Sequence, residues 1–276
     1  MTFIEEIQRF LRNPEPQQSH FRWIRVWEIY SWGSILAILS GILISIIIAR
    51  FGVAPENAVE QVLEDASPWA FAFLAVIAAP VLEELLFRLP ITRYKRDLWL
   101  WLGLMPLLVW VVFGFTPLIV SIMLVLMLIG GVMLFLIKKE RFQFLVHKSF
   151  PLLVYLTSVI FGLIHLGNYS GLPWLSGGIV IFVLPQLIIG FLLAFARVRL
   201  GFLSTILLHA LHNGSITLPI LIMYPALSKL ESGVELLPSE EIRVGISSVV
   251  YILYLIVIIS GVIWSLVAHW KYTSKS

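Results

Sequence analysis

The stretch APVLEELLFRLP, residues 79–90, places two adjacent glutamates and an arginine at the end of a long apolar run. Glu84 and Arg88 are four residues apart, so on a helix they share a face and can form an ion pair. Glu83 is rotated by about 100° from its neighbour and stays outside that pair. Charged side chains within a membrane are usually functional or paired. We therefore expect Glu84 and Arg88 to be structural and Glu83 to be available for chemistry.

Two further polar clusters lie in later apolar stretches. The sequence FGLIHLGN contains His165 and Asn168, and LLHALHNG contains His209, His212 and Asn213. Each cluster alone is also compatible with hydrogen-bonded packing between membrane helices. If the three stretches pack together, they supply a general base, imidazoles and an amide donor. That set is sufficient for water-mediated peptide hydrolysis.

The composition indicates that these clusters lie in a membrane protein. Of the 276 residues, 59% are hydrophobic and 13% are charged, and the mean hydropathy is +0.96. The apolar runs are close to the roughly 20 residues that cross about 30 Å of hydrocarbon. We predict an all-α fold, a polytopic helical bundle of the cell membrane with about eight transmembrane helices. The expected spans are about 32–51, 68–88, 98–114, 116–137, 150–168, 175–196, 201–223 and 246–268.

The charged residues between these spans predict the topology. Basic residues precede the first span, follow the second, fourth and sixth spans, and end the chain. The loop at residues 52–67, by contrast, has four acidic residues and no basic residue. The positive-inside rule then places both termini in the cytoplasm. The net charge of +3 is spread among loops, so we expect the lipid bilayer as a partner and no nucleic acid.

The expected domain organisation has three parts. Residues 1–31 form a cytoplasmic N-terminal segment, in which FIEEIQRFLR has the spacing of an interfacial amphipathic helix; a partly ordered tail is the alternative. Residues 32–270 form a single transmembrane domain with a motif-bearing core at about 68–217. Residues 271–276 form a cytoplasmic tail.

Three motifs follow one another on separate hydrophobic stretches: Glu83-Glu84-x-x-x-Arg88, Phe161-x-x-x-His165 and His209-x-x-x-Asn213. In this order they resemble the CPBP family of intramembrane proteases, also called the CAAX protease and bacteriocin-processing or Abi family. That family includes the type II CAAX prenyl endopeptidases. The resemblance covers roughly residues 68–217.

The resemblance implies an intramembrane endopeptidase that hydrolyses a membrane-associated or prenylated peptide. Carried over by residue, it implies that Glu83 and His165 activate the attacking water. His209 and Asn213 would stabilise the oxyanion of the tetrahedral intermediate.

The same resemblance implies supporting roles for Glu84 and Arg88, which would shape the site. Phe161, one turn before the first motif histidine, would pack against the site or line the substrate, and a lipid-facing position is the alternative. Two features depart from the family pattern. An additional apolar hairpin separates the first two motifs, and Leu89 stands where a glycine often follows the arginine.

Metal dependence is open at this point. Glu83, His165 and His209 have the donor types of a zinc site with an open position for water. The H-E-x-x-H motif, in which one helix supplies two ligands and a base, does not occur in the sequence. We favour metal-free water activation and commit to no cofactor, with a divalent metal such as zinc as the alternative.

Two other functions fit parts of the pattern. A catalytically silent immunity or scaffold protein would keep the same fold. An ion- or proton-coupled transporter would use the buried charges as a relay.

The depths of the motif residues conflict with a single site. At 1.5 Å per residue, Glu83 comes out about 8 Å to the cytoplasmic side of the middle of its span, and His165 about 10 Å to the opposite side of its own. The two can meet only if the helices that carry them are tilted, offset or broken.

Overall fold

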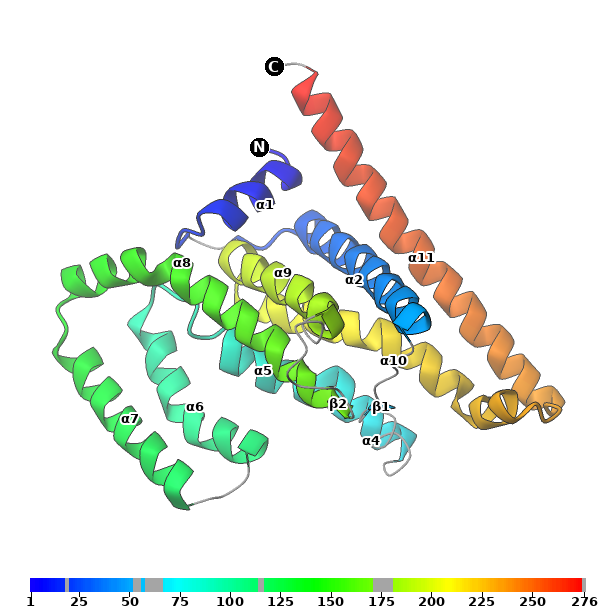
Figure 1. The fold of residues 1–276 in the computed structure, drawn as a ribbon. Coiled ribbons are helices and arrows are strands. Elements are labelled where there is room, and N and C mark those ends of the chain that lie inside the picture. Colours follow the sequence, from blue (N-terminus) through cyan, green and yellow to red (C-terminus); the bar gives the residue numbers. More distant parts are fainter. Residues whose placement is uncertain (18–19, 52–55, 58–66, 114–116, 171–180, 275–276) are drawn as a thin grey trace.

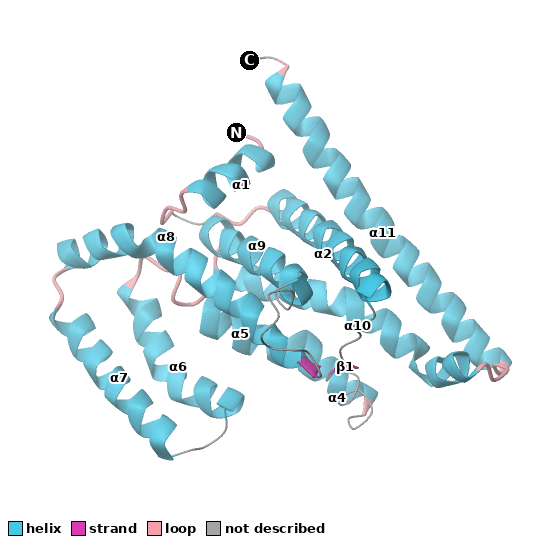
Figure 2. Cartoon of the chain, in the orientation of Figure 1, coloured by secondary structure: helices cyan, strands magenta, loops and turns pink. Residues whose placement is uncertain are grey.

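The computed structural model describes residues 1–17, 20–51, 56–57, 67–113, 117–170 and 181–274. The described part of the chain is almost entirely helical (Figures 1 and 2), which confirms the predicted fold class. One antiparallel pairing joins the two-residue strands β1 (Glu56–Asn57) and β2 (Tyr169–Ser170). The helices of the first half are α1 (Phe3–Arg12), α2 (Trp23–Phe51), α4 (Pro68–Phe73), η1 (Leu74–Ala78), α5 (Ala79–Phe87), α6 (Lys95–Phe113) and α7 (Pro117–Leu136). Those of the second half are α8 (Lys139–Ile164), η2 (His165–Asn168), α9 (Leu184–Leu200), α10 (Phe202–Ser232) and α11 (Pro238–Thr273).

The expected spans coincide with helix over their described residues, apart from Arg88, Ile137 and Gly201 at span ends. Among the described residues, six helical stretches are long and apolar enough to cross a membrane, and Val120–Leu136 is a shorter apolar helix. The start of the span expected at 175–196 lies outside the described residues. The additional hairpin expected between the first two motifs is formed by α6 and α7, which stand beside the rest of the bundle (Figure 1). The chain is a multi-pass integral membrane protein.

The loop expected at residues 224–245 is largely helical, which corrects that prediction. Helix α10 continues to Ser232, and α11 already begins at Pro238. Gly233 ends α10 with a φ of 67°, a conformation that glycine adopts without steric cost. Across this short turn, Lys229 pairs with Glu240 at 2.8 Å. Glu240 and Glu241 therefore lie in the first turn of α11, where the helix dipole favours acidic side chains.

Helix α9 forms the centre of the bundle. Its residues Ile189, Leu192, Leu193 and Phe195 are buried, and helices α2, α8 and α10 pack around it. A Cβ atom at Gly190 would lie 3.0 Å from the backbone oxygen of Ser158 on α8. Glycine therefore permits the close approach of α8 and α9 that positions the second motif.

Helix α1 packs against this centre. Thr2 caps its N-terminus with a capping box, and the rings of Phe3 and Phe10 lie 5.9 and 5.3 Å from the ring of Phe195. The Oγ1 atom of Thr2 lies 2.9 Å from Nδ1 of His269 near the other end of the chain. The amphipathic pattern at residues 3–12 therefore forms a helix whose aromatic residues contact the protein. The two termini lie at the same end of the bundle (Figure 1).

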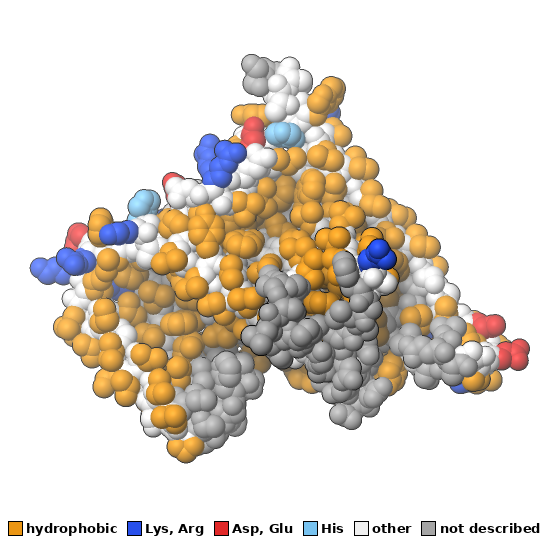
Figure 3. All heavy atoms as spheres, viewed as in Figure 1, with side chains coloured by type: hydrophobic (Ala, Val, Ile, Leu, Met, Phe, Trp, Pro, Cys, Tyr) orange, Lys and Arg blue, Asp and Glu red, His pale blue; other side chains and the backbone are white. Residues whose placement is uncertain are grey.

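The surface matches a protein surrounded by lipid. Hydrophobic side chains cover most of the face in Figure 3, while most of the lysines and arginines in this view lie along the edge near α1 and the start of α8. Acidic side chains lie both along this edge and at the opposite end, near the turn between α10 and α11. Large apolar residues such as Phe135 (79% exposed) and Leu203 (79% exposed) would be costly in water.

Candidate active site

Helix α5 carries the first motif, and a π-helical turn precedes it. In η1 the amide of Ala79 donates to the carbonyl of Leu74, five residues back. In the same register the carbonyl of Ala75 would accept from residue 80, but Pro80 has no N–H. The amide of Asn213 on α10 donates to that carbonyl at 2.9 Å. Asn213 thus satisfies a backbone oxygen that the proline leaves without its helical donor.

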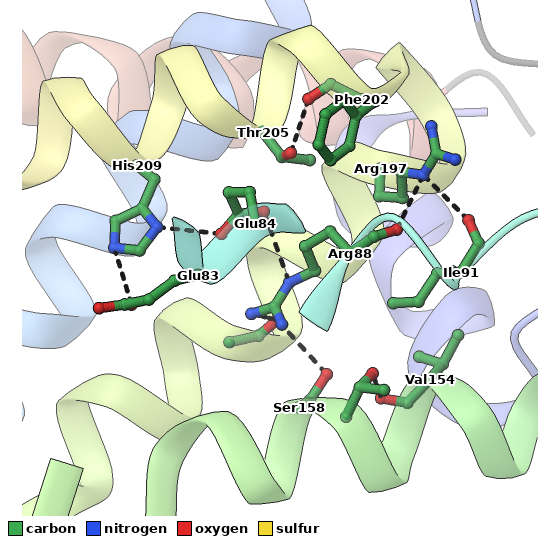
Figure 4. A network of polar contacts seen from close by, with 12 residues as sticks. Glu83, Glu84, Arg88, Ile91, Val154, Ser158, Arg197, Phe202, Thr205 and His209 are labelled. Atoms are coloured by element: carbon green, nitrogen blue, oxygen red, sulfur yellow. Dashed lines mark hydrogen bonds and ion pairs between the residues drawn. The ribbon is translucent and has the colours of Figure 1, made fainter. Parts of the chain in front are cut away.

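Glu84 and Arg88 form the ion pair expected from their spacing. The Nε atom of Arg88 lies 3.8 Å from Oε2 of Glu84, and both side chains are fully buried. The other carboxylate oxygen of Glu84, Oε1, lies 2.9 Å from Nδ1 of His209. The carboxylate therefore joins the first motif to the third (Figure 4). Glu83 is 24% exposed, so only one of the two adjacent carboxylates is accessible.

Residues of α8 and α9 contact the guanidinium of Arg88. Its Nη2 atom donates to the carbonyl of Gly190 on α9 at 3.1 Å, and its Cζ atom lies 4.5 Å from the centroid of the Phe161 ring. Such a cation–π contact is strongest where water is excluded. Phe161 is 1% exposed, so the lipid-facing alternative for this residue is wrong.

His165 is the first residue after α8. Its Nδ1 atom lies 2.7 Å from the backbone oxygen of Phe161, which fixes the orientation of the ring. Its Nε2 atom lies 3.9 Å from Oε2 of Glu83, and Nε2 of His209 lies 3.7 Å from the same oxygen. The structure therefore brings the three residues together.

The protonation pattern at this point follows from the partners. Both Nδ1 atoms face oxygen acceptors, so each carries a hydrogen, and each Nε2 atom of a neutral ring is a hydrogen-bond acceptor. Glu83 Oε2 is buried without a hydrogen-bond partner among the described residues. Glu83, His165 and His209 thus direct three acceptor atoms toward one another. Such a set accommodates a species that supplies donors, such as water or a proton, or a cation.

The donor types would also suit zinc. Two imidazole nitrogens and a carboxylate are common zinc ligands, and each histidine already has the oxygen partner that orients a ligating ring. Within the described residues, however, no group of three or more such side chains is arranged to hold a metal ion. The types of these side chains therefore suit a metal ion, whereas their arrangement around Glu83 Oε2 fits one less well.

The depth conflict is resolved by the course of α8. This helix begins at Lys139, well before the expected start at residue 150, and contains Pro151. It bends and then runs obliquely across α5 (Figure 1). Its C-terminal end consequently reaches Glu83, which lies one turn before the end of α5.

Sequence reasoning missed the residues that fix the end of α5. Arg197 was expected only as a basic residue between spans. Its Nε atom donates to the carbonyls of Arg88 at 3.0 Å and Ile91 at 2.9 Å, and its Nη2 atom to Asp97 at 2.8 Å. Thr92 donates to the same carboxylate at 2.8 Å. Arg197 is thus a cap for the carbonyls at the end of the motif helix.

Asp97 lies before the expected third span, and its charge is stabilised locally. Burial alone would raise the pKa of this carboxyl, but hydrogen bonds from Thr92 and Arg197 outweigh burial. The pKa of Asp97 therefore lies below its usual value of 3.8. An ionised carboxylate here keeps Arg197 oriented toward the end of α5.

The fold and this site define a polytopic helical membrane protein with a buried centre of carboxylates and histidines. Residues 140–215 match the family model described as type II CAAX prenyl endopeptidase Rce1-like. This match supports the placement of the chain in the CPBP family and, at the general level, a CAAX-type intramembrane protease. The matched range includes the second and third motifs, whereas Glu83, Glu84 and Arg88 precede it. Comparison with curated proteins and with solved structures gives no match.

Proposed function

We propose that this protein is an intramembrane endopeptidase in which Glu83 and His165 activate water. The observation that carries the proposal is the position of the Glu83 carboxylate between the Nε2 atoms of His165 and His209, at 3.9 and 3.7 Å. These separations exceed a direct hydrogen bond, and a water molecule placed beside the atoms, not between them, can reach Glu83 and an imidazole within hydrogen-bond distance. Glu83 Oε2 is buried and has no hydrogen-bond partner among the described residues, so a water molecule there would satisfy it.

In the proposed reaction the water oxygen attacks the carbonyl carbon of the scissile peptide bond. Glu83 accepts the proton that the water loses, and His165 orients the water through Nε2. General base catalysis of this kind contributes about 10²- to 10⁴-fold. When the tetrahedral intermediate collapses, the C–N bond breaks and Glu83 returns the proton to the leaving amine.

The carbonyl oxygen becomes an oxyanion in this step. In the reacting state Nε2 of His209 carries a proton and donates to the oxyanion, while the buried Glu84 carboxylate holds the ring at Nδ1, 2.9 Å away. Asn213 uses one amide hydrogen on Ala75 and keeps a second for the oxyanion. We propose supporting roles for Glu84, Arg88 and Phe161, which hold the ring of His209 and the end of α5 in place.

The proposed substrate is a membrane-associated peptide, with prenylated and unmodified peptides both as candidates. The proposed topology has both termini in the cytoplasm, with residues 1–31 and 271–276 outside a single transmembrane domain. Lysines and arginines near α1 and α8 support that orientation (Figure 3).

The experiment that tests this function is a cleavage assay on protein purified in detergent. Wild-type protein is incubated with a pool of fluorogenic peptides with and without a prenyl group, and its bound metal is measured in the same preparation. We expect hydrolysis without stoichiometric zinc. Cleavage that rises and falls with bound zinc would instead assign Glu83 and the histidines as metal ligands.

Two histidine variants provide a matched comparison within this assay. His165→Ala removes an imidazole from the site, whereas His147→Ala removes an exposed imidazole on the same helix, α8. We expect loss of cleavage in the first variant and wild-type turnover in the second. Equal activity of the two variants would contradict the role of His165.

A further inference from the structure

The first half of α8 carries an excess of positive charge, visible near the start of that helix in Figure 3. Between residues 138 and 148 the chain has four basic residues and a single acidic one, Glu140. All four basic side chains are exposed, and none of them forms an ion pair within the described part of the chain. They are Lys138, Lys139, Arg141 and Lys148. Exposed cations without a counter-charge are available to an anionic partner.

The N-terminal segment on the same edge of the molecule differs in this respect. Residues 1–31 contain four arginines and four glutamates, with no lysine or aspartate. Arg25 pairs with Glu6 at 2.9 Å and with Glu28 at 2.6 Å. The positive-inside rule counts basic residues and depends little on acidic ones. That rule therefore explains why both segments lie on one side of the membrane, but it does not explain the unbalanced charge of α8.

The buried side of this half-helix contacts the ends of α6 and α7. Phe142 is buried, and Nζ of Lys95 at the start of α6 lies 5.7 Å from the centroid of its ring. Lys95 also donates to the carbonyl of Leu134 near the end of α7 at 3.1 Å. Gln143 donates to the carbonyl of Arg93 at 3.2 Å. The first half of α8 is thus fixed to the hairpin near which it runs in Figure 1, and its other side is free.

That free side presents two cations and an aromatic ring. Arg141 and Lys148 are seven residues apart, so on an α-helix they lie within about 20° of each other around the axis and about 10 Å apart along it. Phe144 lies between them on the same side and is 64% exposed. Basic residues beside an exposed apolar ring are typical of a helix that rests in the headgroup region of a membrane.

The neighbouring residues place this face at the level of the lipid headgroups. Phe135 and Leu136 at the end of α7 are 79% and 70% exposed, so these side chains need surrounding lipid. The first cation, Lys138, follows two residues later. An arginine side chain binds phosphate oxygens through two parallel hydrogen bonds, and a lysine binds them as a point charge. The phosphates of acidic phospholipids are the anions that a membrane surface supplies at this level.

We propose that the exposed face of the first half of α8 binds anionic phospholipids of the cytoplasmic leaflet, with their phosphates on Arg141 and Lys148 and the ring of Phe144 between the headgroups. The interaction goes beyond the proposed protease function and is independent of it, because no residue of the candidate active site takes part. It holds the half-helix before Pro151 at the membrane surface, while the second half of α8 leads into the bundle to His165.

A lipid titration of the full-length protein in non-ionic detergent tests this surface. The probes are phosphatidylglycerol and phosphatidylcholine with a pyrene label in one acyl chain, and the readout is energy transfer from the tryptophans. We expect wild type to bind phosphatidylglycerol more tightly than phosphatidylcholine. Arg141→Gln/Lys148→Gln should raise the apparent Kd for phosphatidylglycerol about 25-fold, or about fivefold for each cation removed near an anionic surface. The Kd for phosphatidylcholine should not change.

Arg9→Gln/Arg12→Gln is the matched control, because it removes two exposed arginines from the balanced segment on the same edge. It should bind phosphatidylglycerol as wild type does. An equal loss of affinity in the two double variants would overturn the proposal, since general positive charge and not this face would then attract the lipid. Equal affinity of wild type for the two lipids would overturn it as well. Displacement of the labelled lipid by soluble glycerol phosphate at constant ionic strength would also contradict it, because the face would then bind a free anion.

Discussion

The Nδ1 atom of His209 lies 2.9 Å from Oε1 of Glu84, and both side chains are buried. The same carboxylate faces Arg88 through its second oxygen at 3.8 Å. One glutamate therefore serves two motif residues, one on its own helix and one on α10. Glu83, its neighbour in sequence, is left to face His165 and His209 with Oε2.

The first prediction concerns the stability of this network. Glu84→Gln should strongly destabilise the protein, because it leaves the fully buried guanidinium of Arg88 without a counter-charge. Removal of one partner of a buried ion pair costs about 3–5 kcal/mol. The measurement is thermal unfolding in detergent, followed by the fluorescence of the 10 tryptophans.

A double variant provides the control for this prediction. Glu84→Gln combined with Arg88→Met removes both charges, so it should be less destabilised than the sum of the two single variants. Additive effects would mean that the two residues stabilise the fold independently of each other.

The second prediction concerns the bond between Asn213 and Ala75. Asn213→Ala should lower the melting temperature, since the Ala75 carbonyl then loses its donor at 2.9 Å. Pro80→Ala supplies a backbone N–H close to that carbonyl, so the cost of Asn213→Ala should be smaller in the Pro80→Ala background. We expect a coupling of about 1 kcal/mol, the usual net contribution of one hydrogen bond. Equal costs in the two backgrounds would show that the proline does not create the need for Asn213.

The third prediction concerns pH. The pKa of Asp97 is lowered from 3.8 in the folded protein, so its ionisation stabilises the fold above that value. The contribution should be complete above about pH 5 and be lost as the pH falls through 3.8 and below. We therefore expect the melting temperature of wild type to fall in this range.

Asp97→Asn supplies the comparison. This variant should already be less stable at pH 7, by about 1.5–3 kcal/mol for hydrogen bonds to a charged group. Its melting temperature should change less than that of wild type on acidification. If the melting temperature falls with pH in parallel for the two proteins, Asp97 is not the titrating group.

Much of the fold could be predicted from hydrophobic length alone, because crossing the membrane requires about 20 apolar residues. The ends of the helices could not. The first part of α8, KERFQFLVHKS, carries several charged residues and does not register as a span, yet its Phe142 is buried. That extension and the bend of the helix give His165 its position.

The ion pair of Glu84 and Arg88 follows from local helical spacing and was therefore predictable. The contacts of Asn213 and Arg197 were not, because each joins helices that are far apart in sequence and depends on their register. Arg197 in particular has the sequence signature of a cytoplasmic basic residue, while its hydrogen bonds are made to carbonyls at the end of α5.

The most direct test of the central claim is the turnover number of purified Glu83→Gln beside that of wild type, with the melting temperature of both. Glu241→Gln, an exposed glutamate of α11, is the control. We predict that Glu83→Gln loses at least about 10²-fold in kcat, as expected for removal of a general base, with its melting temperature unchanged. Turnover close to wild type in a folded Glu83→Gln protein would contradict the proposed chemistry.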